Sequence, residues 1–109
     1  MTTLLCKTTD LDELGSIGLE AKVKRKTQDI FIIKKDSEFF AYKNQCPHRL
    51  TQMEWNPNDF LTKDKQHIIC AMHAAMFNLD DGLCISGPCV GESLKRIDIV
   101  VQGDDIFLK

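Results

Sequence analysis

The chain has 109 residues, of which 43% are hydrophobic and 28% charged, and 14 basic against 16 acidic side chains give a net charge of −2. This length suits one domain with one core and argues against a two-domain enzyme. The composition is that of a globular protein rather than a disordered one. Basic residues are scattered apart from a run at 22–26, so the broad basic stripe of a nucleic-acid-binding protein is missing.

Membrane insertion and secretion are not expected. The longest apolar runs, such as residues 30–33 and 97–101, fall far short of the roughly 20 residues that span a bilayer. The first residues contain no basic segment leading into an apolar stretch, so no secretory signal is expected and we infer a cytoplasmic protein. Five cysteines, an odd number, argue against a fully paired disulfide framework and favour metal ligation.

The apolar pattern predicts an all-β domain, because short runs rich in Ile, Val and Phe alternate with polar or glycine-bearing turns. At the start of the chain, Cys6 is expected to be a structural residue of a first strand. Residues 11–14 give the one hint of a helical turn. No internal repeat or linker is visible, so residues 1–109 are expected to form a single domain.

Four hairpins are predicted along the chain. They join residues 29–34 to 38–43, 60–62 to 66–69, 75–79 to 83–85, and 94–101 to 106–108. In the first, Phe31 and Ile33 should lie on one face and Ile30 and Ile32 on the other. In the third, Gly82 supplies the positive φ that a tight turn needs.

The last predicted hairpin begins with an alternating strand. Ile97, Ile99 and Val101 alternate with Arg96 and Asp98, so one face of this strand should be buried and the other exposed to solvent.

Two short motifs carry the chemistry, and each couples a cysteine to a histidine. Cys46 and His48 form a Cys-x-His motif, Cys70 and His73 form a Cys-x-x-His motif, and the 21 residues 49–69 separate them. Two loops of this kind can meet at one site. Both cysteines can then bind one iron of a sulfide-bridged pair and both histidines the other, because each iron needs two protein ligands.

A mononuclear zinc site is the main alternative, since it would use the same four side chains. Structural zinc motifs usually pair Cys with Cys and His with His, so the mixed pairing favours a cluster. Outside the motifs, His67 is most simply a surface residue. Cys84 and Cys89 are most simply small buried residues, although a redox role for them is conceivable.

The stretch from Cys46 to Pro88 resembles the cluster-binding region of the Rieske family. Besides the four ligands, the resemblance includes residues 73–79, followed by Asp81 and Gly82, and then the Ser86-Gly87-Pro88 segment. It implies a Rieske-type antiparallel β-sandwich, a small cluster-binding subdomain at about 46–85, and one [2Fe-2S] cluster held by Cys46, His48, Cys70 and His73. In the family, the Gly-Pro segment forms a third loop over the cluster.

Among Rieske proteins the chain resembles the stand-alone ferredoxins of oxygenase systems. The disulfide positions of the respiratory type are Thr51 and Met72 here, and the positions of its hydroxyl donors are Ala75 and Phe77. Without those donors to the sulfurs, we expect a potential in the lower part of the Rieske range of about −150 to +300 mV.

Two loop positions depart from the family pattern. Glycines are common after the second histidine and two residues after the first, whereas this chain has Ala74 and Leu50. The loops are therefore expected to differ slightly in shape.

The resemblance implies a one-electron carrier rather than an enzyme. It would take electrons from a flavoprotein reductase and pass them to a terminal oxygenase, with neither a nucleic-acid partner nor a membrane span. Two alternatives remain at this point: a small subunit of a redox enzyme, resembling that of assimilatory nitrite reductase, and a zinc-stabilised interaction module.

Overall fold

The computed structural model describes residues 3–12, 15–45, 60–70 and 74–109. Within these ranges the regular elements are short strands and one 3₁₀ turn. They are β1 (Thr3–Lys7), η1 (Thr8–Leu11), β2 (Ser16–Val23), β3 (Lys26–Lys35), β4 (Glu38–Lys43), β5 (Ile68–Ile69), β6 (Met76–Phe77), β7 (Cys84–Ser86), β8 (Arg96–Ile97), β9 (Ile99–Gln102) and β10 (Asp105–Leu108). No helix in the described part of the chain is long and apolar enough to cross a membrane.

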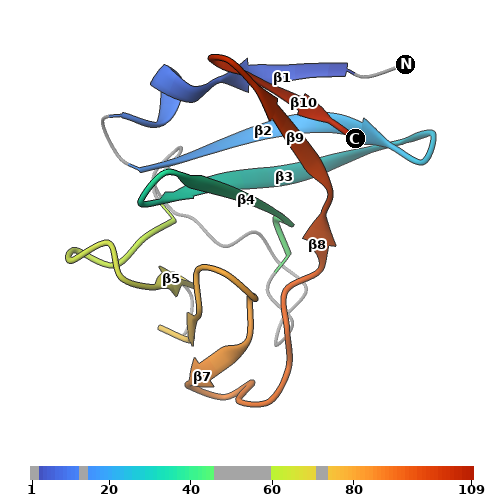
Figure 1. The fold of residues 1–109 in the computed structure, drawn as a ribbon. Helices are drawn as coiled ribbons and strands as arrows, with labels where there is room; N and C mark the ends of the chain where they lie inside the picture. Colours follow the sequence, from blue (N-terminus) through green and yellow to red (C-terminus); the bar gives the residue numbers. More distant parts are fainter. Residues whose placement is uncertain (1–2, 13–14, 46–59, 71–73) are drawn as a thin grey trace.

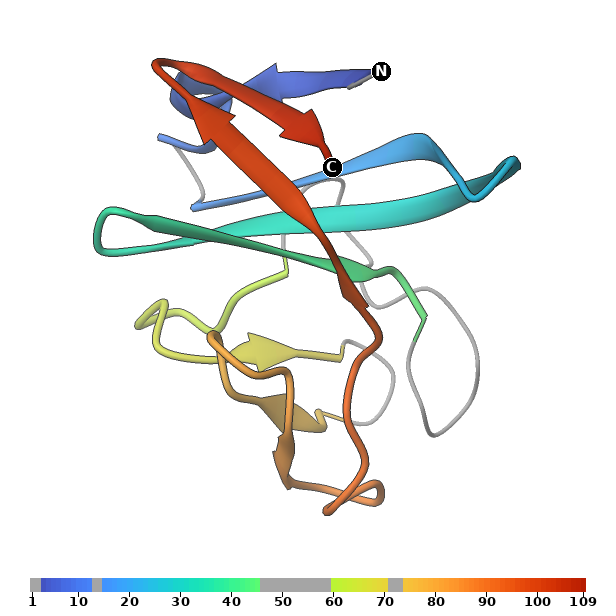
Figure 2. The ribbon, with the colours of Figure 1, turned by 45° about the vertical axis from the view of Figure 1, so that its right-hand side comes forward.

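The strands form three antiparallel sheets that lie in layers. The middle sheet has the order β2-β3-β4-β8, a second sheet has the order β1-β10-β9, and a third, made of very short strands, has the order β5-β6-β7. Figures 1 and 2 show the β1-β10-β9 sheet on one side of the middle sheet and the β5-β6-β7 sheet on the other. The all-β prediction is confirmed, and the sandwich has a separate small sheet beneath it.

Strand β3 is buried on both of its faces. Its four central side chains, Ile30, Phe31, Ile32 and Ile33, are all fully buried. Ile30 and Ile32 belong to the core cluster toward the β1-β10-β9 sheet, whereas Phe31 and Ile33 belong to the cluster toward the small sheet. The predicted alternation is therefore confirmed, and this strand separates two cores because successive side chains point to opposite faces.

Strand β2 and its hairpin with β3 were not predicted. The two strands pair along their whole length, with Val23 opposite Lys26 at the turn. The turn residues Lys24 and Arg25 both have positive φ angles, of 51° and 70°. The basic run at 22–26 is therefore the exposed tip of a two-residue hairpin, a position usually taken by Asn or Gly.

The ends of the chain differ in detail from the prediction. The helical turn is η1, which ends at Leu11 rather than beginning there. The predicted long strand at 94–101 is divided between β8, which pairs with β4, and β9, which pairs with β10. Its alternation continues only in part, because Ile97 is buried while Val101 is 39% exposed. One segment therefore contributes a strand to each of two sheets, and Val101 lies in the exposed second half of β9.

The other predicted hairpins are confirmed, although the strands of the second and third are shorter than expected while β3 is longer. Strands β3 and β4 turn at Asp36 and Ser37, and β6 and β7 turn before Gly82, whose φ is +70°. The hairpin that begins at Phe60 consists of one bridge between Leu61 and Ile68 with flanking backbone hydrogen bonds.

Candidate metal centre

Cys70 follows directly after β5 and is fully buried in the core cluster beneath the middle sheet. Its N–H donates to the Ala75 carbonyl at 2.9 Å, and its own carbonyl accepts from the Ala74 N–H at 2.9 Å. These two bonds close the base of the β5–β6 connection. The described residues on either side of positions 71–73 are therefore held together by backbone hydrogen bonds.

Ala74 lies in the left-handed region of backbone space, with a φ of +56°. An L-residue there costs about 1–2 kcal/mol relative to glycine, because its Cβ crowds the following carbonyl. This is the position at which the sequence departs from the glycine common in the Rieske family. The loop keeps the backbone conformation that suits glycine, so the expected difference in shape is not visible at Ala74 itself.

Gly87 brings the loop after β7 against this same connection. Gly87 has a φ of +101°, and a Cβ added to it would lie 2.8 Å from the Ala75 Cα. Such a distance leaves no room for a side chain unless the backbone moves. The loop after β7 therefore touches the residue next to Ala74 backbone to backbone.

Tyr42 joins the middle sheet to the segment between β6 and β7. Its hydroxyl donates to the Leu79 carbonyl at 2.8 Å, and a Cβ added to Gly82 would lie 2.8 Å from its ring. Burial, with further contributions from Asp81 and Asp80, raises the pKa of Tyr42 to about 12 despite the opposing charge of Arg96. The phenol therefore stays protonated and keeps donating at neutral pH.

Several predicted positions lie outside the described residues. Among the predicted ligands these are Cys46, His48 and His73. The compared loop positions Leu50, Thr51 and Met72 also lie outside. Within the described ranges no three Cys, His, Asp or Glu side chains gather as a metal site. Of the predicted set, only Cys70 can therefore be located.

The described part of the site fits an iron–sulfur cluster. Such clusters bind Cys thiolates, with two histidines replacing two cysteines in the Rieske type. Cys70, one of the predicted ligands, is a buried cysteine, and Ala75 and Phe77 of the same core cluster are fully buried apolar residues. An apolar shell of this kind lowers solvent access to the bound group. Neither residue has a hydroxyl group, and the low potential expected from the sequence stays a prediction.

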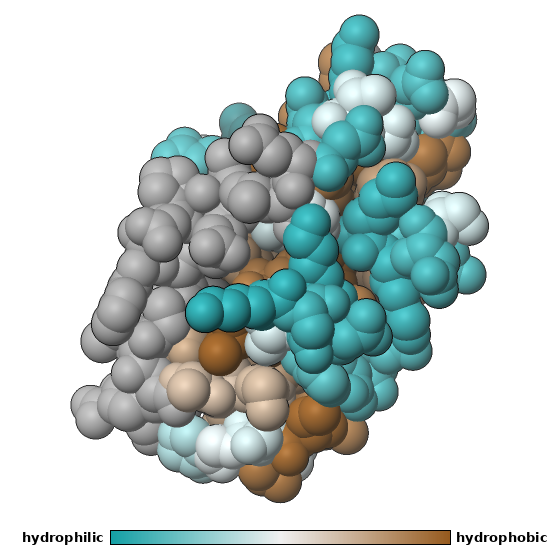
Figure 3. Space-filling view, turned by 90° about the vertical axis from the view of Figure 1, so that its left-hand side faces the viewer, coloured by the Kyte–Doolittle hydropathy of each residue, from teal (hydrophilic) through white to brown (hydrophobic). Residues whose placement is uncertain are grey.

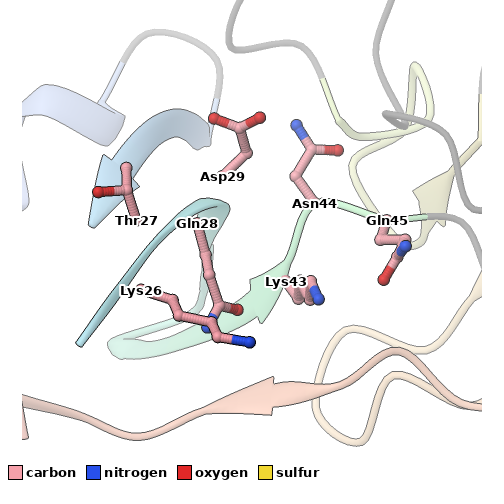
Figure 4. Close-up of a pocket in the computed structure, with 7 residues that line it drawn as sticks. All are labelled: Lys26, Thr27, Gln28, Asp29, Lys43, Asn44 and Gln45. Carbon is pink, nitrogen blue, oxygen red and sulfur yellow. The ribbon is translucent and has the colours of Figure 1, made fainter. Parts of the chain in front are cut away.

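A shallow pocket of about 420 Å³ lies beside the segment that leads to Cys46. It is lined by Lys26, Thr27, Gln28, Asp29, Lys43, Asn44 and Gln45. Figure 4 shows Asp29 and Asn44 pointing to one side, while Lys26 and Gln28 point to the other, as alternation along a strand demands. Small-molecule sites are mostly apolar, so this lining of polar and oppositely charged groups is unlike a substrate pocket.

The remaining described cysteines are buried, as predicted. Cys6 lies in β1, and burial together with the nearby Asp10 raises the pKa of its thiol to about 11. Cys84 and Cys89 lie on either side of Gly87, with their sulfur atoms 3.1 Å apart. Sequence reasoning named both residues but had no signal for this contact, or for those of Gly87 and Tyr42.

Relatives with the same architecture are known. The chain is 26% identical over 104 residues to the 3-phenylpropionate/cinnamic acid dioxygenase ferredoxin subunit of Photorhabdus laumondii, covering 95% of this chain and 90% of that one. The ferredoxin of carbazole 1,9a-dioxygenase from Nocardioides aromaticivorans has the same fold, with a TM-score of 0.74 and 18% identity over 99% of this chain and 96% of that chain.

The fold also occurs inside a larger protein. The terminal oxygenase of carbazole 1,9a-dioxygenase from Novosphingobium matches with a TM-score of 0.79 and 15% identity, over 98% of this chain but only 29% of the oxygenase chain. The model of the Rieske [2Fe-2S] domain matches residues 2–101. The chain therefore belongs to the Rieske [2Fe-2S] domain family, and its cofactor is one [2Fe-2S] cluster.

Proposed function

We propose that this chain is the ferredoxin component of a multicomponent oxygenase, which accepts one electron from a flavoprotein reductase and delivers it to a terminal oxygenase. The observation that carries the proposal is the match to a dioxygenase ferredoxin subunit across 95% of this chain and 90% of that one. The cluster supplies one-electron redox chemistry when bound. We further propose that the protein works in the cytoplasm as a single domain, residues 1–109, without a nucleic-acid partner.

Cys46 and Cys70 are proposed to hold one iron, and His48 and His73 the other. The buried position of Cys70 and the closed base of its loop support this arrangement. The chain's role is then to orient these donors and keep water from the sulfurs. The two histidines have a second ring nitrogen, which would face the partner if their loops project from the small sheet.

The ligand proposal is tested by comparing His73→Ala with His67→Ala. His67 is a half-buried histidine outside both motifs, so it controls for the loss of an imidazole. We expect His73→Ala to lose iron, sulfide and the paramagnetic resonance signal of the reduced protein, while His67→Ala keeps all three. A wild-type protein that holds one zinc and no sulfide would support the zinc alternative instead.

An apolar rim beside the candidate centre supports docking of a partner there. We define this rim as Leu83, Ile85 and Val90, which are 37%, 43% and 63% exposed. All three flank the segment that contacts Ala75 through Gly87. Figure 3 shows apolar surface at the lower end of the molecule, the end at which Figure 1 draws β7. Electron-transfer partners bind through small, weak interfaces, for which a short rim is sufficient.

The docking proposal is tested by reconstitution with the reductase and terminal oxygenase of the same organism. Val90→Glu places a charge in the rim, and Leu4→Glu makes the same change at a 55% exposed position on β1. We expect Val90→Glu to slow reoxidation of the reduced chain by the oxygenase at least several-fold, while Leu4→Glu has no effect. Failure of the wild-type chain to reduce any terminal oxygenase, with transfer to a nitrite reductase instead, would overturn the proposed function.

A further inference from the structure

Cys84 and Cys89 form a close pair of thiols that the proposed function does not use. The Cys89 sulfur donates to the Cys84 sulfur at 3.1 Å, and the Cys84 sulfur lies 3.3 Å from the Ser86 carbonyl. The side chains are almost fully buried, with exposed fractions of 1% for Cys84 and 3% for Cys89. A disulfide bond is about 2.05 Å long, so closing one would bring the sulfurs together by about 1 Å.

The backbone around the pair holds this arrangement without help from the sulfurs. The Cys84 N–H donates to the Glu92 carbonyl at 2.8 Å, and its carbonyl accepts from the Gly91 N–H at 3.2 Å. The Glu92 N–H donates to the Cys89 carbonyl at 2.9 Å. These bonds define the segment 84–92, which we call the thiol loop. The two sulfurs are therefore held close by a folded loop rather than meeting by rotation of exposed side chains.

The sulfur separation favours a dithiol over a metal site. Tetrahedral zinc with Zn–S bonds of about 2.3 Å holds two sulfurs about 3.8 Å apart, which is wider than the 3.1 Å found here. Both residues have exposed neighbours in the sequence, including Ile85 and Val90. The two cysteines therefore lie next to exposed residues, and a local opening of the thiol loop would let a small reagent reach their sulfur atoms.

We propose that Cys84 and Cys89 are a reversible redox pair that closes to a disulfide by exchange with a small-molecule disulfide such as oxidised glutathione. One protein thiolate attacks the reagent, forming a mixed disulfide and releasing one small thiolate. The second cysteine then attacks the mixed disulfide and releases the other. Two protein thiols become one disulfide while one reagent disulfide becomes two thiols, so two electrons and two protons pass to the reagent.

The disulfide would act on the ligand loop through Gly87, which lies between the two cysteines. Gly87 touches the Ala75 backbone, and Ala75 accepts the hydrogen bond from Cys70. Joining the sulfurs restricts the thiol loop to conformations near this contact, because a cross-link removes the extended alternatives. The oxidised protein should therefore release its cluster more slowly on heating than the reduced protein.

The experiment uses the anaerobic holoprotein, equilibrated with glutathione buffers of increasing oxidised fraction and then alkylated under denaturing conditions. Cleavage before aspartate gives the peptide 81–97, in which Cys84 and Cys89 are the only cysteines. We expect alkylation of the two cysteines to be lost together. The unalkylated peptide should then be lighter than its dithiol form by two hydrogen atoms. Dithiothreitol should restore both. Iron and sulfide content is measured in parallel.

Three variants complete the test. Cys84→Ser and Cys89→Ser should each abolish the mass change, whereas Cys6→Ser, a buried cysteine in β1, should leave it intact. Circular dichroism checks that each variant folds. If a variant does not fold, the alkylation result for the wild-type protein still tests the proposal. The proposal is overturned if the peptide stays fully alkylated in the most oxidising buffer, if single glutathione adducts accumulate instead, or if native mass spectrometry finds zinc on the pair.

Discussion

The two faces of the middle sheet are stabilised in different ways. Toward the β1-β10-β9 sheet, the core consists mainly of aliphatic side chains such as Ile30, Ile32 and Ile106, which lie between that sheet and the middle sheet. Toward the small sheet, strands are two or three residues long, and single contacts such as that of Tyr42 with Leu79 recur. The first core is mainly aliphatic, whereas the second is a core rich in aromatic side chains to which single close contacts such as that of Tyr42 are added.

Truncating two neighbouring side chains of β3 should distinguish the effects of the two faces on stability and on the cofactor. Phe31→Ala removes a ring stacked on Phe60 at 4.4 Å, and Ile32→Ala removes a side chain from the opposite core. Each should lower the free energy of unfolding by about 2–5 kcal/mol. Only Phe31→Ala should change the visible spectrum and the reduction potential. Equal spectral changes in both variants would show that the faces are not independent.

Gly87→Ala tests the backbone contact on the small-sheet side. Gly91→Ala is the matched control, because Gly91 also has a positive φ, of 94°, but nothing lies within 4 Å of an added Cβ. Both variants bear the left-handed strain, and only Gly87→Ala adds a clash with Ala75. We expect Gly87→Ala to cost about 1–3 kcal/mol more than the control, with faster cluster loss. Equal melting temperatures would argue against the close approach.

Tyr42→Phe leaves the buried Leu79 carbonyl without its donor, which should cost about 1–2 kcal/mol. The pKa of Tyr42 in the folded protein is about 12, above its ordinary value of 10.0. Its contribution is therefore complete below pH 10 and is lost as the pH rises toward 12. Thermal unfolding of the wild-type protein should show this alkaline decline, and the variant should show less of it. If the stability of both proteins declines equally with rising pH, Tyr42 is not the cause of the decline.

Ala74→Gly should stabilise the protein by up to about 1 kcal/mol, because glycine relieves the strain of about 1–2 kcal/mol at a φ of +56° but loses about 0.5–1 kcal/mol more chain entropy on folding. Ala41→Gly is the control, since Ala41 is buried within β4 and the same change there should destabilise by about 1 kcal/mol or more. Opposite signs in thermal unfolding would confirm the local strain. A loss of stability at both positions would contradict it.

The hairpin of β3 and β4 was predictable from the sequence, because residues 30–33 form a short apolar run bounded by polar residues. Strand β2 was missed, although Ile17, Leu19, Ala21 and Val23 alternate with polar residues or glycine and pack on the aliphatic core. The turn gave no sequence signal, because residues 24 and 25 are Lys and Arg rather than Asn or Gly, although their backbone angles are left-handed. Propensity alone cannot anticipate a turn that the paired strands impose.

The candidate centre was predictable in a different sense. The two motifs indicated the family, because few chemistries need mixed Cys and His pairs, and the domain match confirms it, whereas the four predicted ligands stay a prediction. Contacts such as that between Gly87 and Ala75, or between Cys84 and Cys89, join residues whose approach depends on how the loops fold back. No periodicity encodes such distances, so they emerge only from the structure.

Pairing of Thr3 with Leu108 has a practical consequence. Both ends of the described chain lie on the β1-β10-β9 side of the middle sheet, away from the small sheet that carries Cys70 (Figure 1). A linker, an affinity tag or a thiol anchor for a gold surface can therefore be attached at either terminus without covering the redox end. Immobilised in this way, the protein would present its cofactor to partner proteins in solution, as a surface-based binding assay requires.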